Sequence, residues 1–268
     1  VALCAQGLAN YLLRENIGDR GLVIGWDTRF GSMEFARQVA EVISGNGIPV
    51  FWYDRPCPTP VLSYSVLIKK AAGAGIITAS HNPPMWNGFK YKSEYAGSAS
   101  PEIIAQLEEE IQKVVDRQVN VSVGGDPRVH QLVENIDPVK PYVEQVGKMV
   151  DLNLITNGGL KVVVDSMYGA GGGYLPFLLR GGSTLVTEIN GDPNPAFPGI
   201  CQPEPIASNL RLLSQVVIDQ NADVGIALDG DGDRLVVCDE GGTIVDGDII
   251  LALFGRYALN TGTLKSGI

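Results

Sequence analysis

Short apolar runs alternate with segments of helical periodicity along this chain, and the same alternation occurs twice. In the first half, three expected strands have two expected helices between them. In chain order these elements are 21–26, 32–44, 49–53, 61–71 and 74–79. This order predicts a mostly parallel sheet with helices on its faces, and Ser32 is expected to cap the first helix.

The second half repeats this order after a lead-in helix. The expected elements are 137–150, 160–164, 175–179, 183–189, 206–219 and 222–228. The sequence therefore predicts the α/β class, as two successive α/β/α domains over 1–136 and 137–245. A turn between short strands is expected at 124–127. A helix from 248 indicates the start of a third domain at 246–268, so we expect the chain to be part of a longer protein.

Acidic residues outnumber basic ones, 30 to 20, so this chain of 268 residues has a net charge of −10. Such a balance argues against a nucleic-acid partner or an anionic membrane surface. The longest apolar runs, such as 249–254, are far shorter than the roughly 20 residues of a membrane-spanning helix. The four cysteines form no CxxC motif, which is typical of reduced thiols in a cytoplasmic protein. The composition indicates no oligomeric state.

Three aspartates at alternate positions, Asp229, Asp231 and Asp233, directly follow the last expected strand of the second half. Carboxylates so close together repel one another unless a cation lies between them. Gly230 and Gly232 allow the backbone to turn tightly enough for the three side chains to converge. The sequence therefore predicts a site for one metal ion at this loop.

The same loop has the ligand spacing of an EF-hand if Glu240 is its last ligand. Two observations argue against such a calcium loop. Arg234 stands where an EF-hand needs glycine, and the flanking segments are expected to be strands. A few carboxylates with room left for water and phosphate suit Mg²⁺ better than Ca²⁺. Arg234 is then expected beside the metal, where it can hold a phosphate.

Ser80 lies just beyond the third expected strand of the first half, where open α/β sheets bind ligands. A serine hydroxyl together with a metal site is typical of phosphoryl transfer. Adjacent side chains on an extended segment point apart, so His81 is expected to be structural or to contact phosphate, and not to be the base for Ser80. The other histidine, His130, lies outside any motif, which leaves a Ser-His-Asp hydrolase little support.

Lys90 closes the segment 87–90, ten residues after Ser80. A lysine held near a metal can exchange a proton with a sugar hydroxyl. We therefore interpret Lys90 as the general acid and base.

A glycine cluster at 169–173 follows another expected strand and suggests a dinucleotide-binding turn. Tyr174 occupies the place of the third glycine that such a turn requires. A tight strand-to-helix connection is therefore the better interpretation.

These motifs resemble those of the α-D-phosphohexomutases, the superfamily of phosphoglucomutases and phosphomannomutases. Residues 78–83 with 87–90 are similar to the family's phosphoserine loop, and residues 229–234 are similar to its metal loop. Residues 25–29 resemble a first-domain G-x-D-x-R segment, and the stretch 203–227 also matches the family pattern. The resemblance covers essentially the whole chain and implies a phosphohexomutase-like fold. The family has four domains, and its sugar-selecting loop and C-terminal phosphate clamp belong to the third and fourth.

The resemblance implies a role for each motif residue. Ser80 would carry the phosphoryl group and complete a site for one Mg²⁺ ion with Asp229, Asp231 and Asp233. Lys90 would act as general acid and base. Four further residues would support the phosphoserine or the substrate phosphate: Arg29, His81, Asn82 and Arg234.

The implied function is the interconversion of hexose 1-phosphate and hexose 6-phosphate through a phosphoserine and a hexose 1,6-bisphosphate, which is also the activator. Glucose and mannose phosphates are the expected substrates, and a phosphoglucosamine mutase acting on glucosamine phosphate is an alternative. The same motifs would also serve a metal-dependent sugar phosphatase or a phosphosugar-binding module without catalysis. We expect this chain alone to turn over hexose phosphate poorly.

Overall fold

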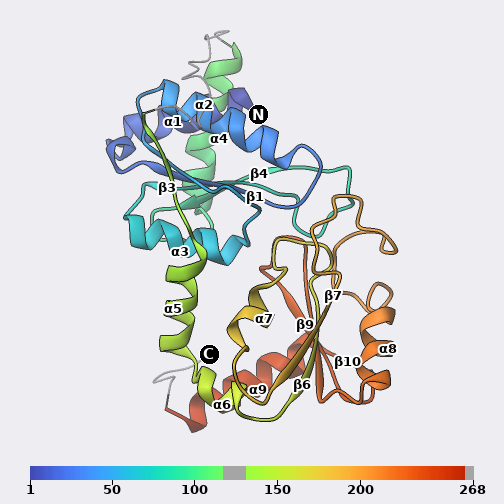
Figure 1. Cartoon of the computed structure of the whole chain (residues 1–268). Coiled ribbons are helices and arrows are strands. Elements are labelled where there is room, and N and C mark those ends of the chain that lie inside the picture. Colours follow the sequence, from blue (N-terminus) through green and yellow to red (C-terminus); the bar gives the residue numbers. More distant parts are fainter. Residues whose placement is uncertain (117–130, 263–268) are drawn as a thin grey trace.

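The computed structural model describes residues 1–116 and 131–262, which fold around two five-stranded sheets (Figure 1). The helices are α1 (Ala2–Arg14), α2 (Ser32–Gly45), α3 (Thr59–Lys69), α4 (Pro101–Asp116), α5 (Val139–Met149), α6 (Leu152–Thr156), α7 (Tyr174–Leu178), α8 (Arg211–Asp219) and α9 (Gly247–Asn260), with a short 3₁₀ turn at Gly18–Arg20. None of the helices in these described ranges is long and apolar enough to cross a membrane.

The strands of the first sheet are β1 (Leu22–Trp26), β2 (Val50–Trp52), β3 (Gly73–Ile77), β4 (Phe89–Ser93) and β5 (Val133–Asn135). Their order is β4-β3-β1-β2-β5, and all are parallel except β4, which is antiparallel to β3. Helices α1 and α2 cover one face and α3 covers the other (Figure 1). Because both faces are covered, β1 and β3 are buried throughout, which explains their near-continuous apolar sequences.

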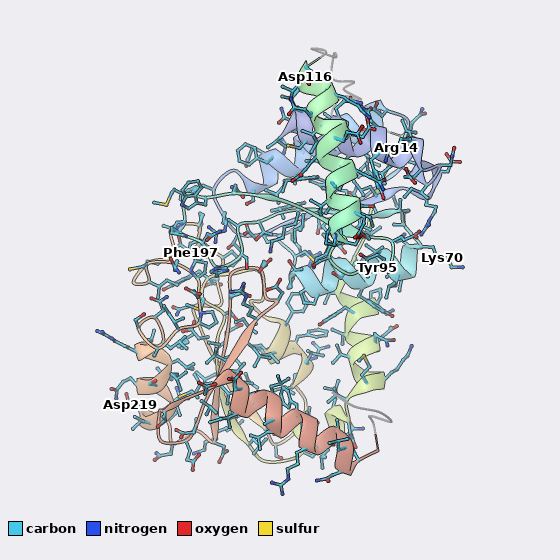
Figure 2. The ribbon with its side chains drawn as sticks, turned by 180° about the vertical axis from the view of Figure 1, so that it is seen from behind. Arg14, Lys70, Tyr95, Asp116, Phe197 and Asp219 are labelled. Atoms are coloured by element: carbon cyan, nitrogen blue, oxygen red, sulfur yellow. The ribbon has the colours of Figure 1, made fainter. Side chains whose placement is uncertain are left out.

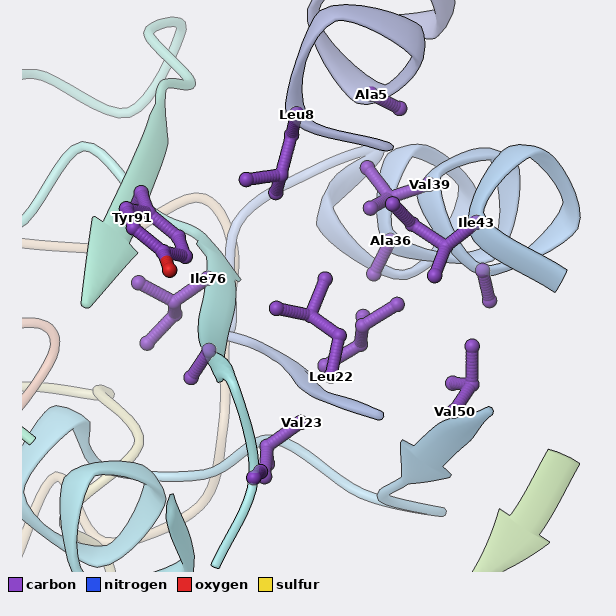
Figure 3. Close-up of a cluster of buried hydrophobic side chains, with 14 of the residues drawn as sticks. Ala5, Leu8, Leu22, Val23, Ala36, Val39, Ile43, Val50, Ile76 and Tyr91 are labelled. Carbon is purple, nitrogen blue, oxygen red and sulfur yellow. The ribbon is translucent and has the colours of Figure 1, made fainter. Parts of the chain in front are cut away.

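The core of the first half fills both faces of its sheet, and part of it lies between the sheet and helices α1 and α2. Figure 3 shows Leu8 of α1 and Ile43 of α2 above Leu22 of β1 and Ile76 of β3. All four side chains are buried. These apolar contacts fix the sheet on which the loop after β3 is mounted.

The strands of the second sheet are β6 (Lys161–Asp165), β7 (Leu185–Ile189), β8 (Val224–Leu228), β9 (Leu235–Cys238) and β10 (Ile244–Val245). Their order is β10-β9-β8-β6-β7, with β6, β7 and β8 parallel and β9 antiparallel to both neighbours. Helix α8 packs on one face through Leu213 and Val217. The glycine cluster lies in the connection from β6 to α7, so the expected strand-to-helix turn is confirmed. The α/β class with mostly parallel sheets is also confirmed.

Several expected details differ in the structure. Ser32 is the first helical residue of α2 and does not cap it, because its hydroxyl faces Asp27 Oδ1 at 2.7 Å and Asn87 Oδ1 at 2.9 Å instead. Strand β4 was not expected, although Phe89, Tyr91 and Ser93 alternate with two lysines in a strand pattern. Helix α8 begins at Arg211, after the expected start at 206. The expected turn at 124–127 lies outside the described residues, and the domain boundaries at 136 and 245 stay predictions.

Leu62 of α3 should be a main contributor to the stability of the first half. It is fully buried and fills the space beside Gly25 of β1, where an added Cβ would lie 2.5 Å from Leu62 Cδ1. We expect Leu62→Ala to lower the free energy of unfolding by about 2–5 kcal/mol, because it leaves a cavity. Leu67→Ala on the same helix is the control, since Leu67 is 51% exposed and should change stability by less than about 0.5 kcal/mol. Urea unfolding measures both, and equal effects would contradict this account.

Candidate active site

The loops after β3 and β8 bring Ser80 and Asp229 together from opposite halves of the chain. Ser80 Oγ donates a hydrogen bond of 3.0 Å to Asp229 Oδ2. The two backbones approach so closely that a Cβ on Gly230 would lie 2.6 Å from Ser80 O. Position 230 therefore requires glycine, and the expected nucleophile of one half lies against the expected metal ligands of the other.

Ser80 has a left-handed backbone conformation, with φ of 52°. This conformation costs a residue with a side chain roughly 1–2 kcal/mol, so surrounding groups must hold it. It also corrects the expectation that Ser80 and His81 point apart. The chain is not extended at Ser80, and His81 Nδ1 lies 3.4 Å from Ser80 Oγ. His81 therefore lies next to any group carried on the serine oxygen.

The three aspartates converge on one point, where each places a carboxylate oxygen within 4.8 Å of the other two. Asp229 and Asp231 are fully buried, whereas Asp233 is exposed. Asp229 Oδ1 accepts hydrogen bonds of 3.0 Å from the backbone N–H groups of Asp233 and Arg234. These bonds curl the loop around the carboxylate, so its side chains face inward.

Asp231 Oδ1 is buried and has no hydrogen-bond partner among the described residues. A buried carboxylate oxygen without a donor is costly unless a cation takes the donor's place. The oxygen-only set of Asp229, Asp231, Asp233 and the Ser80 hydroxyl suits a hard divalent ion such as Mg²⁺. The residues present therefore fit the expected metal.

Burial and repulsion give the two buried aspartates different affinities for protons. Burial, together with the charge of Asp231, raises the pKa of Asp229 to about 7. Burial also acts to raise the pKa of Asp231, but the charge of Lys90 and the hydrogen bond from Thr59 outweigh it and hold that pKa below its usual value. A cation between the two carboxylates would favour the charged form of both.

Two side chains of the first half donate to Asp231 Oδ2. Lys90 Nζ lies 3.0 Å from this oxygen and Thr59 Oγ1 lies 2.8 Å from it. Thr59 also donates its backbone N–H to Asp231 O at 2.8 Å, which ties the start of α3 to the metal loop. The Lys90 side chain is 38% exposed, so it contacts the buried Asp231 carboxylate and also reaches solvent.

A cavity of about 360 Å³ opens in front of Ser80. Its lining includes four more residues that the sequence singled out: His81, Asn82, Lys90 and Arg234. Two cationic side chains at the mouth of a polar cavity attract an anionic ligand, and a phosphate group has the required charge and acceptor oxygens.

Arg29 does not face this cavity. Its side chain is fully buried and pairs with Asp27 at 3.0 Å. Its two terminal nitrogens donate to the carbonyl oxygens of Ser80, Asn82 and Pro83 at 2.6, 2.6 and 2.7 Å. The expected support of the phosphoserine by Arg29 would therefore act through the backbone that carries Ser80.

Two polar residues of the site, Asp27 and Thr59, were given no role from the sequence, although Asp27 belongs to the G-x-D-x-R segment at 25–29. Asp27 directly follows β1, and Thr59 begins the helix that follows β2. Both positions lie at the edge of the sheet where Ser80 follows β3, since β1, β2 and β3 are parallel. The shared edge is the signal that could have identified them.

Comparison with known proteins matches both halves of the chain to one family, the family that the sequence motifs resemble. Residues 1–118 match the family model for phosphoglucomutase/phosphomannomutase alpha/beta/alpha domain I, and residues 140–242 match the model for domain II. The phosphoglucosamine mutases of Cronobacter sakazakii and Proteus mirabilis are each 32% identical to this chain, over 251 and 252 residues. In both cases the match covers 93% of this chain and 54% of the relative.

Solved structures agree with this result. The crystal structure of a phosphoglucomutase/phosphomannomutase family protein from Burkholderia thailandensis matches with a TM-score of 0.80 and 27% identity, over 98% of this chain and 55% of that one. The chain thus spans about half the length of the relatives it matches. With both sheets, both loops and both domain models in agreement, the chain belongs to the phosphoglucomutase/phosphomannomutase family, of which it carries the α/β/α domains I and II.

Proposed function

We propose that this chain carries the phosphoryl-transfer centre of a phosphohexomutase, which interconverts hexose 1-phosphate and hexose 6-phosphate. One observation carries the proposal: Ser80 Oγ lies 3.0 Å from Asp229 Oδ2, within a cluster of three converging carboxylates. A phosphate carried on this hydroxyl would be repelled by the neighbouring carboxylates unless a cation offsets their charge. The orphaned oxygen of Asp231 supports a cation at this point.

Asp229, Asp231 and Asp233 would hold one Mg²⁺ ion, and Ser80 or its phosphate would complete the site. When bound, the ion would neutralise charge on the phosphate oxygens and so lower the barrier to transfer of the phosphoryl group. Arg234 and His81, which line the cavity beside Ser80, would hold the phosphate. Asn82 offers a polar side chain on the same wall.

In the proposed reaction a free hydroxyl of the hexose phosphate attacks the phosphorus of phosphoserine 80. The new P–O bond forms as the bond to Ser80 Oγ breaks. Lys90 takes the hydroxyl proton and returns it to the serine oxygen as that oxygen leaves phosphorus. The hexose 1,6-bisphosphate then turns around, and its other phosphoryl group returns to Ser80. The same bisphosphate, added from solution, phosphorylates Ser80 before the first turnover and so acts as activator.

Glucose and mannose phosphates remain the sugars that the sequence predicts. The phosphoglucosamine mutases among the relatives favour glucosamine phosphate as the alternative. A metal-dependent sugar phosphatase differs in one step, because water attacks phosphoserine 80 instead of a sugar hydroxyl. Comparing inorganic phosphate release with isomerised sugar phosphate separates these two functions. We also retain a cytoplasmic location as a prediction from the sequence.

Replacing the proposed nucleophile should abolish phosphorylation. After incubation with glucose 1,6-bisphosphate and Mg²⁺, the unaltered chain should gain one phosphate by intact-mass spectrometry, and Ser80→Ala should gain none. Ser98→Ala is the matched control, since this exposed serine lies outside the cavity and should leave phosphorylation unchanged. A phosphate on Ser80→Ala would refute the nucleophile assignment. If the unaltered chain gains none, a binding module without catalysis is favoured.

Binding of Mg²⁺ should tighten as the pH rises from 6 to 8. The raised pKa of Asp229, about 7, means that this carboxyl is largely protonated at pH 6 and must lose its proton before it can bind a cation. Isothermal titration calorimetry should therefore give an apparent affinity for Mg²⁺ that is about tenfold weaker at pH 6 than at pH 8. Asp229→Asn should weaken binding at both values and flatten the difference. Asp219→Asn, on the exposed surface of α8, should behave like the unaltered chain, and a pH-independent affinity in that chain would contradict the account.

A further inference from the structure

The backbone N–H and C=O groups of Ser80 are both linked to one buried carboxylate, that of Asp27, through Thr78 and Arg29. The Ser80 N–H donates to Thr78 Oγ1 at 2.8 Å, and its carbonyl oxygen accepts from Arg29 Nη2 at 2.6 Å. Thr78 Oγ1 and Arg29 Nε in turn both donate to the same atom, Asp27 Oδ2, at 2.7 and 3.0 Å. A closed ring of hydrogen bonds therefore runs from Asp27 through the two peptide groups of the nucleophile and back.

The other oxygen of Asp27 fixes this ring to the sheet and to helix α2. Asp27 Oδ1 accepts from the Arg29 backbone N–H at 3.0 Å and from Ser32 Oγ at 2.7 Å. The Asp27 N–H donates to Ile77 O at 3.0 Å, so the backbone of Asp27 is tied to the last residue of β3. Both Asp27 and Arg29 are almost entirely buried. Neither therefore contacts a ligand in the cavity.

Arg29 also links the loop to the second half of the chain. Its guanidinium carbon lies 5.4 Å from the centre of the Phe197 ring, in a cation–π arrangement. Figure 2 shows Phe197 on the second half, near its junction with the first. The guanidinium is thus fixed by the Asp27 carboxylate, by four carbonyl oxygens and by an aromatic ring. A lysine in its place has one nitrogen and cannot reach these partners together.

We propose that Asp27, Arg29 and Thr78 are positioning residues that hold Ser80 in its left-handed conformation and so aim Oγ at Asp229. Left-handed backbone at a residue with a side chain persists only where the surroundings impose it, and this ring supplies the constraint. Without it, Ser80 relaxes to an ordinary φ and its Oγ turns away from the carboxylates. The inference rests on the proposed phosphorylation of Ser80 for its kinetic test, but its structural test is independent.

The kinetic test measures how fast the chain is phosphorylated by increasing concentrations of glucose 1,6-bisphosphate at fixed Mg²⁺. Arg29→Lys should lower the limiting rate by at least about tenfold and leave the half-saturating concentration within about twofold, because a misplacement near 1 Å costs about 100-fold while binding groups stay in place. Thr78→Val keeps the shape of the threonine side chain but removes its hydroxyl, and it should also lower the limiting rate. It replaces Arg29→Lys as the test if that variant does not fold.

The matched control is Arg20→Lys. Arg20 also donates to two backbone carbonyls, of Lys70 and Ala71, and pairs with Glu94, but it lies far from the Ser80 loop in sequence and contacts none of its residues. This variant should be phosphorylated like the unaltered chain. A normal limiting rate in Arg29→Lys, or a raised half-saturating concentration at a normal rate, would overturn the proposal, since the latter indicates a direct phosphate contact.

The structural test is a crystal structure of Arg29→Lys or Thr78→Val. Ser80 should leave the left-handed region, and its Oγ should separate from Asp229 Oδ2. An unchanged φ near 52° with the 3.0 Å contact intact would overturn the proposal, whatever the activity. If the unaltered chain gains no phosphate while the variants lose the Ser80 conformation, the proposed function fails and the positioning role stands.

Discussion

The candidate site depends on two carboxylates, Asp229 and Asp231, that are buried side by side at the junction of two sheets. Burying like charges together is unfavourable, and the structure offsets the cost unequally. Asp231 receives Lys90 and Thr59 from the first half, whereas Asp229 receives two backbone N–H groups and the Ser80 hydroxyl. Asp231 Oδ1 remains without a donor among the described residues, and we propose that a cation takes this place.

Each sheet contributes to this junction through the loop that follows one of its central strands. The first sheet supplies a rigid loop, whose backbone is held from behind by Arg29. The second supplies a tight turn, in which Gly230 lets the chain pass against Ser80 O and Gly232 adopts a φ of 68°. The relative positions of Ser80 and Asp229 are therefore fixed by backbone segments that buried polar groups hold in place. The cavity beside Ser80 has only to supply positive charge and space for a ligand.

The fold and the two loops could be predicted because their signals are local. Apolar runs mark β1, β3 and β8, and the motif residues follow these strands directly. The contacts made by Thr59 and Asp27 could not be predicted in the same way, because each depends on which strands become neighbours in the sheet. The approach of His81 to Ser80 was missed for a different reason. It follows from a left-handed φ at a serine, which local preference disfavours and only the surrounding ring of hydrogen bonds imposes.

The shared contact between Ser80 and Asp229 has a consequence for motion of the two halves. Because Ser80 and Asp229 follow strands of different sheets, a rotation that parts the halves would let water reach Asp229. Hydration removes the main cause of its raised pKa, so opening releases a proton and closing takes one up near neutral pH. The angle between the two sheets and the protonation of the site are thus thermodynamically linked, through the burial of Asp229 between the two halves.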